Sequence, residues 1–240
     1  MADVVVAPAK LTVSLRITGV RDDGYHLIDA EMVSLDLADR LTITEGEGVE
    51  IVGPAAGGIA TGDSNLVRRA LTAAGRRAHV RVEKHIRAGA GLGGGSSDAA
   101  AILRWAGVND LALAASIGAD VPFCLVGGRA RVTGIGEVVE PLPFVSCTYT
   151  IVTPPFGVST TEVYRAWDAL PVREAGPNDL EAAAIKVQPR LASWRDRIAR
   201  VTGRVPMLAG SGSTWFVEGD HRQAADALAP AVLVVARAIS

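Results

Sequence analysis

The sequence has few aromatic residues and no strong excess of charge of either sign. Phe, Trp and Tyr together make up 5% of its 240 residues, which leaves few rings on which nucleic-acid bases can stack. The formal net charge is −2, so no basic surface for a polyanion or an anionic membrane is expected. Neither feature favours nucleic acid or an anionic membrane as a partner.

Cysteine is scarce, and long apolar runs are absent. Cys124 and Cys147 are the two cysteines, and together with the four scattered histidines they show no metal-ligand spacing. We therefore expect free thiols in a reducing compartment and no protein-bound metal. The longest apolar run, around 227–236, contains Pro230 and is too short to span a bilayer. Because the N-terminus also lacks the basic region and long apolar core of a signal peptide, we expect a cytoplasmic protein.

The order of apolar patterns and turn signals predicts an α+β fold rather than a repeating βαβ array. The character of the sequence changes near residue 145, which predicts a domain boundary there and two domains, residues 1–145 and 146–240. Predicted strands cover residues 4–17, 25–44, 79–84, 123–126, 129–133, 149–153 and 231–237 and both sides of 210–213. Predicted helices cover residues 65–74, from the glycine-rich segment to 105, 110–117, 160–169, 178–187, 190–200 and 221–228.

The first predicted strand alternates between apolar and polar residues from Lys10 onward. Since neighbouring strand residues point to opposite faces, the apolar residues 11, 13, 15 and 17 are expected on one face. The polar residues from Lys10 to Arg16 are expected on the other. On this pattern alone, Lys10 is interpreted as a solvated lysine at a sheet edge.

A glycine-rich segment, residues 87–98, is the most informative part of the sequence. Five of the seven residues from 89 to 95 are glycine, so backbone N–H groups can approach an anion without interference from a Cβ atom. The predicted helix that follows would add its N-terminal N–H groups and its dipole. Ser96 and Ser97 would cap that helix or turn their hydroxyls toward a phosphate or a phosphate-bound metal. The segment predicts a phosphate-binding loop; the alternative is a glycine-rich connection with serine caps.

Two other phosphate-binding motifs were compared with this segment. No lysine follows the glycines, which excludes a Walker loop. Gly89-x-Gly91-x-x-Gly94, with Asp110 about twenty residues further on, satisfies the dinucleotide fingerprint. However, a strand should carry that acid, and residues 108–117 look helical. A nicotinamide-dependent oxidoreductase therefore stays a weak alternative.

Several residues outside the glycine segment are candidates for catalysis or for binding a substrate ring. Asp120, in Gly-Ala-Asp-Val-Pro, reads by itself as a turn or capping aspartate. Beside an anion-binding loop, a carboxylate can orient or deprotonate an acceptor hydroxyl, and the cationic Lys10 can stabilise the transferred group. Tyr25 and His26 follow an Asp-Gly turn and could stack on and hydrogen-bond a ring.

Five segments together resemble one family. They occur in the order seen in the 4-diphosphocytidyl-2-C-methyl-D-erythritol kinases, a family of the galactokinase, homoserine kinase, mevalonate kinase and phosphomevalonate kinase (GHMP) superfamily. The resemblance runs from about residue 6 to the last predicted strand. The segments are Pro8-Ala-Lys10, Asp23-Gly-Tyr-His26, Gly89 to Asp98, Gly118-Ala-Asp-Val-Pro122 and Gly210-Ser-Gly212.

The resemblance implies a two-lobed α+β kinase with its active site between an ATP-binding lobe, residues 1–145, and a substrate-side lobe, residues 146–240. It implies phosphorylation of the 2-hydroxyl of 4-diphosphocytidyl-2-C-methyl-D-erythritol by ATP with Mg²⁺, in a monomer or weak homodimer. Asp120 would be the catalytic carboxylate and Lys10 its cationic partner. The implied ATP-binding residues are Asn65, Leu66, Lys84, Arg87, Ala88, Gly89, Ala90, Gly91, Leu92, Gly93, Gly94, Gly95, Ser96 and Ser97. The implied substrate-binding residues are Thr12, Tyr25, His26, Tyr164, Gly210 and Gly212.

The chain departs from the family pattern at two places. Thr12 stands where the family usually has Asn, which keeps a hydroxyl but loses the donor-plus-acceptor pattern of an amide. The segment between the glycines and Gly118 is also shorter by roughly a helical turn. The alternatives are therefore another GHMP-type small-molecule kinase or a catalytically weakened nucleotide-binding paralogue.

Overall fold

The computed structural model describes residues 2–171 and 176–240. Its strands are β1 (Asp3–Val20), β2 (His26–Thr44), β3 (Gly48–Val52), β4 (His79–Glu83), β5 (Arg129–Gly134), β6 (Val138–Pro141), β7 (Thr148–Thr153), β8 (Met207–Leu208), β9 (Trp215–Glu218) and β10 (Val232–Ile239). Its helices are α1 (Leu66–Ala73), α2 (Gly94–Trp105), α3 (Leu111–Ile117), α4 (Val121–Val126), α5 (Thr160–Asp168), α6 (Glu181–Val187) and α7 (Arg190–Thr202), with 3₁₀ turns η1 (Arg222–Ala224) and η2 (Asp226–Leu228).

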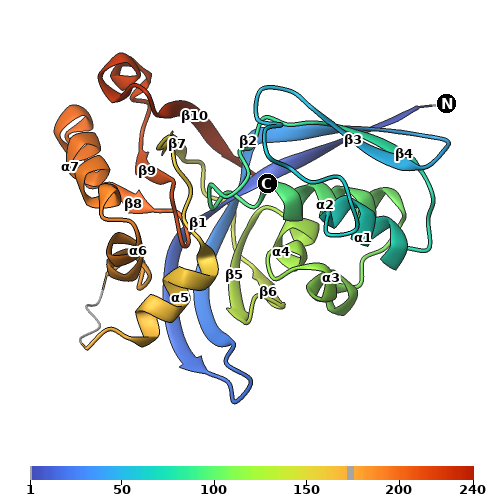
Figure 1. Cartoon of the computed structure of the whole chain (residues 1–240), viewed down its shortest axis with the longest axis horizontal. Coiled ribbons are helices and arrows are strands. Elements are labelled where there is room, and N and C mark those ends of the chain that lie inside the picture. Colours follow the sequence, from blue (N-terminus) through green and yellow to red (C-terminus); the bar gives the residue numbers. More distant parts are fainter. Residues whose placement is uncertain (1, 172–175) are drawn as a thin grey trace.

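A long antiparallel hairpin of β1 and β2 runs through the whole molecule (Figure 1). Strand β2 also pairs with β4, β5 and β10, while β10 pairs with β7. Figure 1 shows α1 to α4 gathered on one side of the hairpin and α5 to α7 on the other, beside β7 to β9. The predicted mixture of helices and strands is confirmed, and the proposed boundary at residue 145 stays a prediction.

Strand β1 does not keep the strict alternation that its sequence predicts. Its register against β2 shifts between Pro8 and Lys10, between Thr12 and Ser14, and between Ile17 and Gly19. A bulge inserts one extra residue and turns the following side chains to the opposite face. Leu11 and Leu15 consequently belong to different apolar clusters, although the sequence predicts one shared face. Lys10 and Thr12 are buried, so the interpretation of Lys10 as a solvated edge residue is wrong.

Two predicted elements differ from the secondary structure that is observed. Residues 121–126 are helix α4 rather than a strand. Pro122 lies in the first helical turn, where proline is tolerated, and Asp120 stands at the N-cap position without a side-chain capping hydrogen bond. The predicted helix at 221–228 is two short 3₁₀ turns, and strand β6 was not predicted.

Asp110 caps α3 by accepting hydrogen bonds from the N–H groups of Ala112 and Leu113. It therefore does not lie at the end of a strand, as a dinucleotide-binding fold requires.

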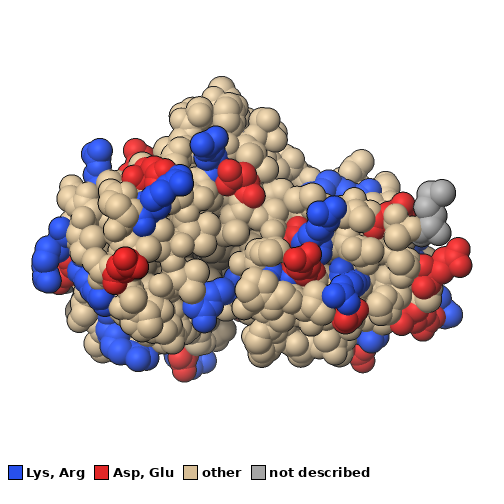
Figure 2. Space-filling model, turned by 90° about the horizontal axis from the view of Figure 1, so that it is seen from above, with Lys and Arg blue, Asp and Glu red and all other residues tan. Residues whose placement is uncertain are grey.

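Three features of the described residues relate to the composition of the chain. None of the helices formed by residues 2–171 and 176–240 is long and apolar enough to cross a bilayer. Cys124 and Cys147 are free thiols. On the face shown in Figure 2, basic and acidic side chains are interspersed among uncharged ones, in keeping with the small net charge.

Candidate active site

The glycine-rich segment forms a tight turn that leads directly into α2. Gly91 and Gly93 have φ angles of 79° and 67°, in the left-handed region that favours glycine. A Cβ atom at Gly91 would lie 2.5 Å from the carbonyl oxygen of Ala209, and one at Gly93 would lie 2.5 Å from Cγ of Lys10. The glycines therefore allow the loop to contact both β1 and the turn between β8 and β9.

The start of α2 is free of side-chain caps. Its N-cap is Gly93, and the expected serine cap does not form. Ser97 is buried and donates its hydroxyl to the carbonyl oxygen of Pro8 at 2.5 Å, whereas Ser96 lines the adjacent cavity. Uncapped N–H groups at a helix start, together with the helix dipole, favour an anion there.

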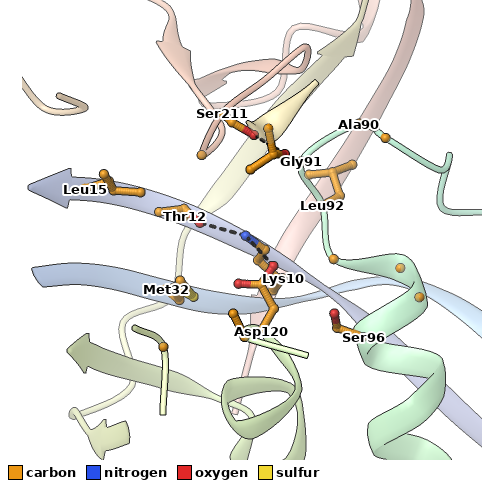
Figure 3. A pocket seen from close by; sticks show the side chains of 18 of the residues that line it. Lys10, Thr12, Leu15, Met32, Ala90, Gly91, Leu92, Ser96, Asp120 and Ser211 are labelled. Carbon is orange, nitrogen blue, oxygen red and sulfur yellow. Dashed lines mark hydrogen bonds and ion pairs between the residues drawn. The ribbon is translucent and has the colours of Figure 1, made fainter. Parts of the chain in front are cut away.

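Lys10 and Asp120 form an ion pair beside this loop (Figure 3). The distance from Lys10 Nζ to Asp120 Oδ2 is 3.2 Å, and the side chains are 7% and 33% exposed. Lys10 Nζ also donates to Thr12 Oγ1 at 3.1 Å, and the backbone N–H of Lys10 donates to the carbonyl oxygen of Leu92 at 3.0 Å. Residues from β1, the glycine loop and the start of α4 thus meet at one point.

A cavity of about 490 Å³ opens onto this pair. Predicted site residues that line it are Lys10, Thr12, Leu66, Arg87, Ala88, Gly89, Ala90, Gly91, Leu92, Gly93, Gly94, Gly95, Ser96, Asp120, Tyr164 and Gly210. Lining residues that were not predicted are Leu15, Ile28, Met32, Ala119, Ile135, Gly136, Thr160, Leu180 and Ser211. Of these, Ser211 had a signal in the sequence, since it lies between two predicted glycines.

A second cavity, of about 210 Å³, adjoins the loop and is lined by Asn65, Leu66 and Lys84 among others. Asn65 caps α1 by accepting from the N–H of Val67 at 2.9 Å and donates to the carbonyl oxygen of Ala60 at 2.8 Å. Leu66 borders both cavities. The structure therefore brings these three predicted residues to one side of the glycine loop, where the ammonium of Lys84 is held by carboxylates.

Lys84 lies buried between two aspartates beneath the loop. Its Nζ donates to Asp98 Oδ2 at 2.6 Å and to Asp39 Oδ2. Asp39 Oδ1 accepts from the N–H groups of His85 and Ile86 at 2.6 and 2.9 Å, whereas the buried Asp98 Oδ1 has no partner. Burial raises the pKa of Asp98 from 3.8 to about 7, opposed by the Lys84 charge and assisted by the Asp39 carboxylate.

The raised pKa of Asp98 predicts a pH dependence of stability. Between its ordinary pKa and about 7, the folded chain binds more protons at this site than the unfolded chain. The free energy of unfolding should therefore fall as pH rises through this range. Chemical unfolding of the wild type and Asp98→Asn from pH 5 to 8 checks this: the wild type should lose stability relative to the variant as pH rises. Asp63→Asn, an exposed control, should follow the wild type, and an identical pH slope in Asp98→Asn would contradict the assignment.

Of the three residues predicted to hold a substrate ring, His26 and Tyr164 lie together at α5. The rings of His26 and Tyr164 contact each other with centroids 4.7 Å apart, and His26 Nε2 lies 2.7 Å from Asp168 Oδ1. Burial, with a smaller contribution from the charge of Asp120, raises the pKa of Tyr164 to about 12, so its phenol keeps its proton. Tyr25 is 60% exposed, and neither it nor Gly212 lines the larger cavity.

Comparison with known proteins agrees with this geometry. Residues 65–128 match the family described as GHMP kinases N terminal domain. The chain is 39% identical over 237 residues to 4-diphosphocytidyl-2-C-methyl-D-erythritol kinase from Paracoccus denitrificans, covering 88% of this chain and 84% of the relative. It is 37% identical to the kinase of the same name from Cereibacter sphaeroides, covering 92% of each.

Solved structures give the same result. A crystal structure of 4-(cytidine 5'-diphospho)-2C-methyl-D-erythritol kinase superposes with a TM-score of 0.80, at 34% identity and with both chains fully covered. Homoserine kinase from Cytophaga hutchinsonii shares the fold, with a TM-score of 0.67 at 18% identity. The fold and the site thus define a small-molecule kinase of the GHMP class. Within that class, the chain belongs to the 4-diphosphocytidyl-2-C-methyl-D-erythritol kinase family.

Proposed function

We propose that this chain transfers the terminal phosphoryl group of ATP to the 2-hydroxyl of 4-diphosphocytidyl-2-C-methyl-D-erythritol, a step of the non-mevalonate isoprenoid pathway. The observation that carries the proposal is the Lys10–Asp120 pair at 3.2 Å, directly beside the glycine loop. Membership of the family supports the choice of acceptor. Phosphoryl transfer depends mainly on positioning and electrostatics, and this arrangement offers both.

ATP would lie along the loop, with its phosphates near the uncapped start of α2. The N–H groups of the loop would donate to phosphate oxygens, and Arg87 would add a cation at the cavity edge. The adenine would occupy the adjoining 210 Å³ cavity, whose walls include Asn65 and Leu66. This placement would direct the terminal phosphate toward Lys10.

Asp120 would accept a hydrogen bond from the acceptor hydroxyl and orient it for attack, or take its proton. The ammonium of Lys10 would stabilise the negative charge on the transferred group. Thr12 Oγ1 accepts a hydrogen bond from Lys10, so its own proton is free to be donated into the cavity. Thr12 thus retains an acceptor for the lysine at the position where the family usually has Asn.

The described residues also fit a magnesium ion that arrives with ATP. Within residues 2–171 and 176–240, no group of three or more His, Cys, Asp or Glu side chains is placed to hold a metal. Mg²⁺ usually keeps several waters and binds through one or two protein oxygens plus substrate phosphates. The Ser96 hydroxyl lines the same cavity and would supply one such oxygen, while Asp120 stays with the acceptor hydroxyl. The ion would neutralise charge on the phosphates.

The test is a coupled ADP-release assay with purified protein, ATP and 4-diphosphocytidyl-2-C-methyl-D-erythritol. Turnover on this acceptor supports the proposal. Turnover only on homoserine or mevalonate would reassign the chain within its superfamily. ATP binding without turnover on any acceptor would favour a weakened nucleotide-binding paralogue.

Tyr164→Ala tests whether the aromatic wall of the cavity holds the acceptor. We expect a loss of about 1–3 kcal/mol of acceptor binding, because a ring that contacts a base contributes roughly this much. Steady-state kinetics should show a raised KM for the acceptor and an unchanged KM for ATP. Tyr164→Phe, which keeps the ring, is the matched control and should retain most of the affinity. A change confined to the KM for ATP would mean that ATP and the acceptor have been assigned to the wrong sides of the cavity.

A further inference from the structure

Asn178 is a buried polar residue in the segment that leads into α6. Its side-chain Oδ1 accepts from the N–H of Leu180 at 2.9 Å, just before α6 begins. Its Nδ2 donates to the carbonyl oxygens of Leu208 and Gly210 at 2.8 and 2.7 Å. One carboxamide therefore joins the start of α6 to the turn between β8 and β9.

The segment that carries Asn178 is also bound to β1. The N–H of Leu15 donates to the carbonyl oxygen of Pro177, and the N–H of Asp179 donates to the carbonyl oxygen of Leu15, both at 2.9 Å. Asp179 Oδ2 accepts from the N–H of Ile17 at 2.9 Å. The segment is thus anchored a few residues beyond Lys10 and Thr12, on the same strand.

The turn held by Asn178 forms a wall of the cavity. Gly210 and Ser211 line it, and a Cβ atom on Gly210 would lie 3.9 Å from Lys10 Nζ and 3.9 Å from Thr12 Oγ1. In the view of Figure 3, Ser211 and Asp120 lie on opposite sides of Lys10. The position of this turn therefore fixes the width of the space beside the Lys10–Asp120 pair.

We propose that Asn178 is a positioning residue for phosphoryl transfer. It sets the distance between the turn at 209–212 and β1, and so the place of the acceptor hydroxyl; this inference rests on the proposed function. An amide is required because two carbonyl oxygens need donors while one N–H needs an acceptor. A carboxylate of the same shape would keep the bond from Leu180 and lose both donors.

Asn178→Asp is the test, because it changes the donors and keeps the shape. We expect kcat/KM for the acceptor to fall about 10- to 100-fold, the loss that follows when a reacting group is displaced by roughly 1 Å. The Kd for ATP should stay within about threefold of the wild-type value. Asp179→Asn is the matched control from the same segment. It keeps an acceptor for Ile17 and loses only the ion pair with the half-exposed Arg16, so it should stay within about twofold. Wild-type kcat/KM in Asn178→Asp, or an equal loss in Asp179→Asn, would overturn the proposal.

Amide hydrogen exchange separates this inference from the proposed function. The N–H groups of Ala209 and Gly212 are bonded within the turn, to the carbonyl oxygens of Thr214 and Ala209. In Asn178→Asp they should exchange at least about 10-fold faster, while the N–H of Leu180 stays protected. If the wild type shows no turnover on the acceptor, the proposed function fails but the exchange result still decides the role of Asn178. Unchanged exchange in the turn would refute that role.

Discussion

Asp120→Asn is expected to lower kcat by on the order of 10²- to 10⁴-fold, while ATP binding stays unchanged. The substitution keeps the size of the side chain and removes the charge that faces Lys10 at 3.2 Å. An amide cannot take the proton of the acceptor hydroxyl, and it leaves the ammonium of Lys10 without its carboxylate. Single-turnover rates at saturating ATP and acceptor measure the effect, and calorimetric titration with an ATP analogue measures the nucleotide affinity.

Asp110→Asn provides the control for this experiment. Asp110 is an exposed N-cap of α3, and Asn caps helices about as well as Asp does. Its kcat should equal that of the wild type. If Asp120→Asn retained wild-type kcat, or lost activity only in proportion to a loss of ATP affinity, Asp120 would have no part in the chemical step.

Lys84→Met is expected to destabilise the fold by about 3–5 kcal/mol, the usual effect of removing one partner from a buried ion pair. Lys84, Asp39 and Asp98 are all buried, and the lysine is the cation that both carboxylates contact. Its loss would leave two neighbouring carboxylates without a counter-charge. Urea unfolding at constant pH gives the change in free energy directly.

The matched control for this prediction is Lys186→Met, which changes an exposed lysine on α6. Its free energy of unfolding should stay within about 0.5 kcal/mol of wild type. The double variant Lys84→Met with Asp98→Asn should recover part of the loss, because one of the two carboxylates is then gone. Equal stability of Lys84→Met and Lys186→Met would show that the buried lysine does not hold the loop in place.

Local signals predicted most of the elements that carry the site. The glycine segment predicted the loop and the start of α2, because glycines allow the positive φ angles of a tight loop whatever distant residues surround it. The Asp23-Gly24 turn and the strand beyond it also follow from local sequence. Residues 121–126 show the opposite case: the run Phe-Cys-Leu-Val resembles a strand, but these residues form α4, with Pro122 in its first turn.

Other features depend on contacts between distant residues and could not be predicted from the sequence. The bulges of β1 place Leu15 beside Lys10 and Thr12 in one cavity, whereas alternation alone assigns Leu15 to the opposite face. The burial of Lys84 depends on Asp39, which lies 45 residues away along the chain and carries no motif. The role of Asn178 depends on carbonyl groups 30 and 32 residues further along.

The close approach of Gly91 to the backbone at 209–212 has a consequence for engineering. Because there is no room for even one methyl group between them, the loop proposed to bind ATP and the turn proposed to bind the acceptor are in direct contact. Substitutions at this contact that change the acceptor preference would also weaken the proposed binding of ATP. Under the proposed function, larger or smaller acceptors are better accommodated through Ile28, Met32 and Ile135, which line the same cavity but belong neither to the glycine loop nor to the turn at 209–212.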